Sequence, residues 1–316
     1  MYEIKKGVLD KFIDSLIGKN DVYAPVKRDE AHEFEKIKSS KDIDLNFINS
    51  VNPIKRLFFK ERQTLFEFKG NDMKDVIPKV KSLVVFGIRR CDLNATKRQD
   101  LMFMGDPYYQ AYRKKALLIG LQCTRSGPHC FCGSLGNEDY GDVMLYDKKD
   151  VYLAEPLSQK GEAFLENNEF FSDSKENISE KDKKVPDSEK LKKTSISDLY
   201  DHPDWKKDVV QCLSCGACNT TCPTCYCFDI EDHVCMSDLK KGERQRCWSG
   251  CQLRSFTRVA GDHVFREDRE KRFKHRIYHQ LQWFKERHGI NLCVGCGRCI
   301  TNCPTHIDWV KTMNEM

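Results

Sequence analysis

Two segments of the chain, CLSCGACNTTCP and CVGCGRCITNCP, repeat one cysteine spacing. Their cysteines are Cys212, Cys215, Cys218, Cys222, Cys293, Cys296, Cys299 and Cys303. The spacing is that of the bacterial iron–sulfur run, in which three thiolates hold one [4Fe–4S] cluster and the fourth holds a second cluster. The repeat therefore predicts two such clusters, whose chemistry is one-electron transfer.

The exchange of the fourth cysteine between the runs predicts the ligand sets. We expect one cluster to be held by Cys212, Cys215, Cys218 and Cys303, and the other by Cys293, Cys296, Cys299 and Cys222. A structural zinc site uses paired C-x-x-C motifs and would leave one cysteine over in each loop, so zinc is the poorer interpretation. Residues 223–292 separate the runs and are expected to pack beside the clusters as helices.

Four further cysteines point to a third site in the first half of the chain. They are Cys91, Cys123, Cys130 and Cys132. The first two each follow an apolar, strand-like run, and parallel strands would bring them to the same carboxyl edge of a sheet. We therefore expect a third [4Fe–4S] cluster there, with buried thiols packed as small apolar side chains as the alternative.

The other cysteines carry no motif. They are Cys225, Cys227, Cys235, Cys247 and Cys251. Cys225 and Cys227 could hold another metal together with Cys251 and one of the others, but packing around the cluster pair is favoured.

Basic and histidine side chains follow these cysteines. The pair His275 and His279 shares a helical face and is expected at the surface or in support of a site, not as a zinc site. The basic run is Arg272, Lys274, Arg276 and Lys285. It could offset cluster charge or meet an acidic partner, although such a run is usually a solvated face.

Composition restricts the class of protein. Seventeen cysteines among 316 residues favour metal binding in a reducing compartment over disulfides. Lys and Arg exceed Asp and Glu by 53 − 48 = +5. Each four-thiolate cluster adds about two negative charges, so three clusters would cancel this excess, which weakens a nucleic-acid interpretation. No apolar run spans a bilayer and no secretory signal is evident, so we expect a cytoplasmic protein that binds neither membrane nor nucleic acid.

Local patterns predict an α+β protein with an N-terminal α/β domain, residues 1–171, built on a short parallel sheet. Buried strands are expected at Leu83–Ile88 and Ala116–Leu121, connected by helices at Asp92–Phe103, with Asp92 as the N-cap, and Asp106–Lys115. Two short strands, Val143–Tyr146 and Val151–Leu153, are expected to follow, and a helical face is expected from Ile4 to Ile17.

A charged linker or insertion is expected at residues 172–194. Residues 195–316 are expected to form a mostly helical, ferredoxin-type domain. Its predicted helices are Gly242–Ala260, Arg266–His288 and Asp308–Met313. No dinucleotide-binding GxGxxG, P-loop or GxSxG motif occurs, so the sequence offers no nicotinamide, flavin or nucleophile site of its own, and no catalytic residue is predicted.

Longer runs carry a family resemblance over almost the whole chain. They are FGIRRCDLNA, DPYYQAYR, CFCGSLGN, CLSCGACNTTCPTCYCFDIED, KGERQRCWSGCQLRSFTRVAGDHVFRE, KRFKHRIYH and CVGCGRCITNCP. The chain resembles the β subunits of sulfhydrogenases (sulfur reductases) and the corresponding iron–sulfur subunits of anaerobic sulfite reductases. All four N-terminal cysteines, and also Cys225, Cys227 and Cys251, fall on cysteine positions of that family, whereas Arg90 replaces a frequent proline.

The resemblance implies an iron–sulfur electron-transfer subunit of an oxidoreductase complex. Its partners would be an NAD(P)H-reactive flavoprotein that carries FAD and a catalytic subunit, such as a siroheme sulfite reductase or a NiFe hydrogenase. Whether the chain catalyses a reaction by itself is left open. The alternatives are a self-contained reductase with substrate at an open cluster and a nucleic-acid-binding iron–sulfur protein.

Overall fold

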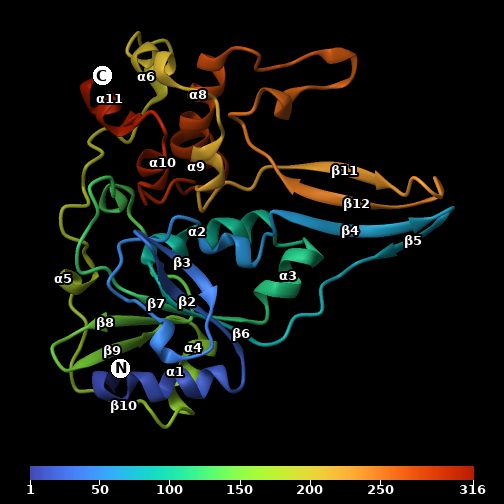
Figure 1. Cartoon of the computed structure of the whole chain (residues 1–316). Helices are drawn as coiled ribbons and strands as arrows, with labels where there is room; N and C mark the ends of the chain where they lie inside the picture. The colour runs from blue at the N-terminus through green and yellow to red at the C-terminus, as the bar shows by residue number, and fades with distance from the viewer.

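The computed structural model describes all 316 residues and contains two regions and a projecting arm. In Figure 1 an α/β region occupies the lower half and a cysteine-rich helical region occupies the upper half. A four-stranded sheet projects to one side between them. None of the helices combines the length and apolar composition that a membrane crossing requires.

The α/β region is built on an eight-stranded mixed sheet in the order β10-β1-β9-β8-β7-β6-β2-β3. The strands are β1 Tyr2–Lys5, β2 Asp21–Arg28, β3 Ala31–Lys36, β6 Leu83–Ile88, β7 Ala116–Leu121, β8 Val143–Asp147, β9 Val151–Pro156 and β10 Ser172–Asp173. The strands β2, β6, β7 and β8 are parallel, and the outer strands pair antiparallel. The prediction that Leu83–Ile88 and Ala116–Leu121 are neighbouring parallel strands is confirmed.

Four helices accompany this sheet. They are α1 Leu9–Ile17, α2 Arg90–Met102, α3 Pro107–Arg113 and α4 Gln159–Glu166. The prediction that Asp92 caps α2 is wrong, because the helix begins two residues earlier and Asp92 lies fully buried inside its first turn. The N-terminal helical face is also shorter than expected, since Tyr2–Lys5 is drawn into the sheet as β1.

The arm joins two hairpins that are distant in sequence. They consist of β4 Arg62–Lys69 with β5 Asp72–Asp75, and β11 Phe228–Val234 with β12 Lys241–Trp248. The prediction of a helix over Gly242–Ala260 is therefore wrong. β12 pairs with β11 on one side and with β4 on the other. Because β4 lies far away in the chain, the residues around β12 alone do not indicate this second pairing.

The C-terminal region packs short helices around the motif loops. They are α6 Trp205–Gln211, α7 Ala217–Thr220, α8 Arg269–Tyr278, α9 Phe284–His288, α10 Arg298–Thr301 and α11 Trp309–Glu315. A π-helical turn, His279–Trp283, joins α8 to α9, so the predicted long helix is present with one irregular turn. The predicted terminal helix is confirmed as α11, capped by Asp308. Trp205, Phe273 and Trp309 belong to the buried core of this region.

The charged segment between the regions is partly anchored. It contains the short helix α5 Glu180–Lys183, whose Lys183 pairs with Asp139 and Glu155. Further along, Ser188 and Leu191 are only 2% and 4% exposed. Most of this segment is exposed, as a charged linker or insertion should be, but ion pairs and a few buried side chains attach it to both regions.

Short 3₁₀ turns complete the fold. They are Lys6–Val8, Ser40–Asp42, Ile54–Leu57, Cys132–Leu135, Ser197–Leu199, Arg254–Thr257 and Ala260–Asp262.

Candidate metal centres

The two motif loops have the same backbone conformation. Gly216 and Gly297 begin α7 and α10 with φ of +80° and +74°, in the left-handed region that favours glycine. Two residues after the first cysteine of each loop, the backbone N–H of Ser214 or Gly295 donates to that cysteine's sulfur at 3.4 Å. The sequence repeat is therefore also a structural repeat, and N–H groups that point at thiolates are typical of iron–sulfur loops.

The repeated cysteines line two neighbouring cavities in crossed sets. The first cavity is lined by Cys212, Cys215, Cys218 and Cys303, with Phe273 and Ile277 in its apolar wall. The second is lined by Cys222, Cys293, Cys296 and Cys299. Cys299 also borders the first cavity, and its sulfur accepts a hydrogen bond from Trp309 Nε1 at 3.4 Å. This lining agrees with the predicted exchange of the fourth cysteine.

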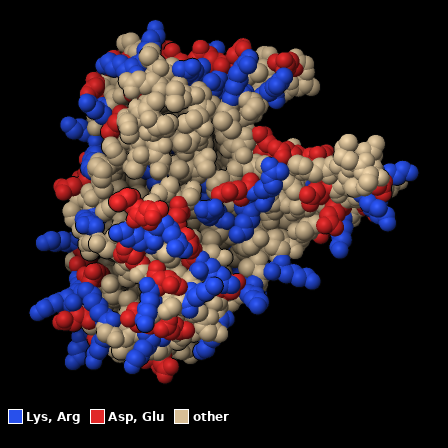
Figure 2. Space-filling model, in the orientation of Figure 1, with Lys and Arg blue, Asp and Glu red and all other residues tan.

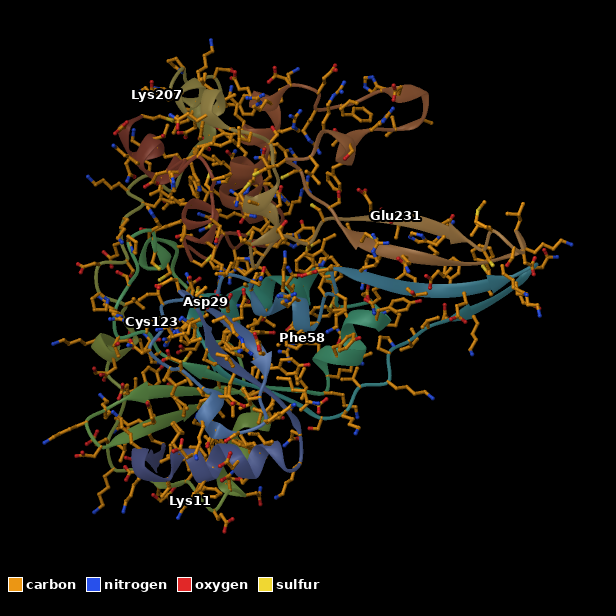
Figure 3. All side chains as sticks on the ribbon, in the orientation of Figure 1. Lys11, Asp29, Phe58, Cys123, Lys207 and Glu231 are labelled. Carbon is orange, nitrogen blue, oxygen red and sulfur yellow. The ribbon has the colours of Figure 1, made fainter.

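The four N-terminal cysteines line a third cavity. It has a volume of about 360 Å³ and is bounded by Cys91, Cys123, Cys130 and Cys132. The sheet explains why they meet: β6 and β7 are adjacent and parallel, so the loops after both strands emerge at the same edge. Figure 3 shows Cys123 near the level where the two regions meet.

The third cavity lies against the second motif loop. The backbone N–H of Phe131 donates to the carbonyl of Gly295 at 2.8 Å, and the Cys130 thiol lies 3.8 Å from the carbonyl of Cys296. A Cβ at Gly295 would lie 2.6 Å from Cys132 Cα, so glycine permits this approach. Three cysteine-lined cavities thus follow one another, with the Cys222/Cys293/Cys296/Cys299 cavity in the middle.

A buried ion pair, which the sequence did not reveal, joins the two regions at this point. Arg298 donates to both carboxylate oxygens of Asp92 at 2.8 and 2.7 Å, and the two side chains are 1% and 0% exposed. The same guanidinium donates to the Ser50 carbonyl at 2.6 Å. Each partner is next to a cysteine in the sequence, Asp92 to Cys91 and Arg298 to Cys299, so the pair fixes the two cysteine sites relative to each other.

Burial raises the pKa values of several thiols that line these cavities. It raises the pKa of Cys132 to about 11 and the pKa values of Cys218 and Cys296 to about 12. Metal binding must displace these protons, so iron loading is favoured as pH rises. The donor set of soft, closely gathered thiols fits a [4Fe–4S] cluster in all three cavities.

Three side chains of the basic run are buried, but only Arg276 lines the cavities, while Lys274 pairs with Glu270. Arg272, Lys274 and Arg276 are 5–6% exposed, so the usual solvated-face interpretation is wrong for these three. Burial opposes the charge of Arg276, but nearby Cys218 and Cys299 outweigh it and raise the guanidinium pKa. Arg276 also donates to the Cys218 carbonyl at 3.0 Å. It therefore compensates negative charge where two cavities meet.

The histidine pair lies on the same helix and is mainly buried. Burial lowers the pKa of both His275 and His279 to about 4. The ring of His279 contacts the Tyr226 hydroxyl at 3.1 Å. Both rings are therefore neutral at pH 7, in agreement with a supporting role.

Three of the remaining cysteines gather beside Cys222. The Asn219 amide donates to Cys225 and Cys251 at 3.7 and 3.5 Å, and Cys227 lies opposite Ser249, two residues before Cys251. The other two cysteines lie on the arm, where Cys235 is exposed and Cys247 contacts Glu231.

The loop pair defines the protein as an iron–sulfur protein of the two-cluster type. A family profile described as "4Fe-4S dicluster domain" matches residues 211–307. Over its whole length the chain is similar to sulfhydrogenase 2 subunit beta of Pyrococcus furiosus, with 34% identity over 97% of this chain and 95% of the relative. The chain belongs to this sulfhydrogenase β-subunit family. No solved structure matches it.

Proposed function

We propose that the chain is the electron-transfer subunit of a multi-subunit oxidoreductase and relays electrons through three [4Fe–4S] clusters. The observation that best supports this proposal is the succession of three cysteine-lined cavities, two of which are built by the dicluster loops. When bound, each cluster would accept and donate one electron at a time. The chain's own residues would bind the clusters, exclude water and compensate their charge.

The ligand sets are those of the sequence analysis. Cys91, Cys123, Cys130 and Cys132 would hold the N-terminal cluster, and the two crossed sets would hold the others. Cys215 is the exposed ligand, and Val210 and Leu213 beside it are 78% and 64% exposed. Figure 2 shows a broad face without charged side chains over the C-terminal region. An uncharged surface beside an exposed cluster ligand suits docking of a redox partner.

The partners would be an FAD-containing, NAD(P)H-reactive flavoprotein and a catalytic subunit of the siroheme sulfite reductase or NiFe hydrogenase type. The name of the Pyrococcus relative, subunit beta of a sulfhydrogenase, supports membership of such an assembly. Nucleic acid is a poor candidate because acidic and basic side chains are interspersed wherever the visible face is charged. We place the complex in the cytoplasm, where the thiols stay reduced.

Anaerobic isolation of the native complex, with identification of its subunits, tests this function. We expect a flavoprotein and a siroheme or nickel–iron subunit to co-purify with the chain, and NAD(P)H to reduce its clusters only when the flavoprotein is present. Purification of the chain alone, with full reductase activity from an artificial donor, would contradict the relay.

That second outcome would favour a self-contained reductase. The observation behind this alternative is the size of the N-terminal cavity, whose rim carries Arg125 and Lys184 as well as the acidic Glu138, Glu180 and Glu189. A small anion could bind there beside the cysteines. Turnover by the isolated chain that is lost in Arg125→Ala, with iron content unchanged, would support this candidate.

A further inference from the structure

Residues 183–191 belong to the charged segment between the two regions, and they border the N-terminal cysteine cavity. We call this stretch the strap. Five of its side chains line the cavity, namely Lys183, Lys184, Val185, Ser188 and Glu189. The strap is therefore part of the site and not only a connection between the two regions.

The strap is bonded to the residues directly after Cys132. The backbone N–H of Gly133 donates to the Ser188 carbonyl at 3.0 Å, and the backbone N–H of Leu191 donates to the Ser134 hydroxyl oxygen at 2.9 Å. A Cβ at Gly133 would lie 2.5 Å from Ser188 Oγ, so glycine permits this close approach. The position of Cys132, a predicted cluster ligand, thus depends on the strap.

Lys190 bonds the strap to a second cysteine loop. Its ammonium donates to the carbonyl oxygens of Gly127 and Pro128 at 2.7 and 2.8 Å. Hydrogen bonds from a charged donor are stronger than those between neutral groups. Because Gly127 and Pro128 lie between Cys123 and Cys130 in the sequence, this one lysine restrains the loop that joins two further predicted ligands.

The strap is anchored at both ends. In Figure 1 it follows α5 and runs from the α/β region toward the cysteine-rich region. At its first residue, Lys183 pairs with Asp139 at 2.7 Å. At the other end Leu191 is buried in the C-terminal core, and the Asn314 amide of α11 donates to the Lys190 carbonyl at 2.7 Å. A segment held at both ends has little conformational freedom, so it restrains the loops that are bonded to it.

We propose that the strap closes the N-terminal cluster site and holds its cysteine loops in place, with Lys190 as the main positioning residue. This role rests on the N-terminal cluster of the proposed function. The strap would restrain three of the four ligands and would shield the cluster from water on one side. Loss of its bonds should release iron from this site and leave the two dicluster loops unaffected.

The rate at which a chelator removes iron from the anaerobically prepared, full-length protein tests the proposal. In the wild type we expect about four of about twelve irons to leave in a separate first phase. Lys190→Met should accelerate this phase about 10- to 100-fold, the range by which residues next to metal ligands change metal affinity, and should leave the later phase unchanged. Because Lys190 is only half-buried, this variant should fold.

Two lysine variants separate positioning from a general loss of stability. Lys190→Arg keeps a charged donor and should stay close to the wild-type rate. The matched control is Lys193→Met, which removes an exposed lysine just beyond the strap and should also leave the rate unchanged. An unchanged first phase in Lys190→Met, or an equal acceleration in Lys193→Met, would overturn the proposal.

Thiol reactivity distinguishes failure of the strap from failure of the three-cluster relay. A wild-type protein with only about eight irons would contradict the relay, and Cys130 and Cys132 would then be free thiols. In that protein, faster alkylation of both cysteines by iodoacetamide in Lys190→Met than in the wild type, measured by peptide mass spectrometry, would support the strap. Equal alkylation rates would overturn it.

Discussion

The N-terminal and C-terminal cysteine sites differ in how the chain assembles them. In the C-terminal region each loop carries, within twelve residues, three predicted ligands of one cluster and one predicted ligand of the other, and the loop conformation is repeated. In the N-terminal region the ligands come from α2, the end of β7 and a following loop, and only the parallel pairing of β6 and β7 brings them together. The dicluster site is local in sequence, whereas the N-terminal site depends on the surrounding sheet.

The two regions also differ in exposure. The N-terminal cavity is the larger one and has charged residues on its rim, while the dicluster cavities are narrower and walled by apolar side chains of the C-terminal core. A cluster in the open site should therefore be the more accessible one to oxygen and chelators. On the proposed assignment, the dicluster would stabilise its own region, whereas an N-terminal cluster would be an addition to a sheet with its own core.

The largest expected effect follows from this contrast. Cys293→Ser should lose at least the four irons of the central cluster and lower the melting temperature of the C-terminal region, because Cys293 packs against its core. Cys132→Ser should lose about four irons and leave the dicluster intact. Iron analysis with thermal unfolding checks both. Equal damage from the two variants would show that the sites are not independent.

The ion pair between the regions gives the next effect. Arg298→Met leaves the Asp92 carboxylate buried without its partner, which should cost about 3–5 kcal/mol of unfolding free energy. Adding Asp92→Asn removes that lone charge and should recover part of the loss, as chemical denaturation can measure. If the double variant were no more stable than the single one, the pair would not be what couples the regions.

Acid should affect the C-terminal region first. Because burial lowers the pKa of His275 and His279 to about 4, these rings stay neutral in the fold while unfolded chains take up protons below about pH 6.5. Stability is therefore lost as pH falls from about 6.5 to 4, by about 1 kcal/mol per histidine because solvent screens these half-buried rings. His275→Phe should reduce this loss, measured as melting temperature against pH. An unchanged pH profile would contradict the buried, neutral state.

A smaller effect is expected at Asp208 on α6. Burial raises its pKa to about 6, and Thr312 on α11 donates to it at 3.0 Å. The fold therefore loses stability as pH rises from about 4 to 6, and Asp208→Asn should gain about 1 kcal/mol at pH 7 but nothing near pH 4. Urea unfolding at both pH values checks this. A gain of equal size at pH 4 would mean that ionisation is not the cause.

Local and non-local features were not equally predictable from the sequence. The buried strands of the parallel pair, α3 and the terminal helix were predictable because apolar runs and helical spacing are local signals. β12 was predicted as a helix because its partner β4 lies far away in the chain. The burial of Arg298 against Asp92 depends on how the regions dock, and no spacing rule reports it.

The site shows the same division. The crossing of the motif cysteines followed from their spacing, and the meeting of Cys91 with Cys123 followed from strand order. A common site for Cys225 and Cys251 was considered from the sequence, but their approach to Asn219 depends on the turn that follows β12. Nothing in the sequence around Lys55 indicated that this lysine would be buried beside Cys225.

The number of clusters tests the central claim most directly. Iron and acid-labile sulfide should be measured in anaerobically prepared wild-type protein and in Cys132→Ser. The account predicts about twelve of each per wild-type chain and about eight in the variant, since each cluster contains four irons and four sulfides. About eight of each in both proteins would show that the N-terminal cysteines hold no cluster, and the three-site relay would be wrong.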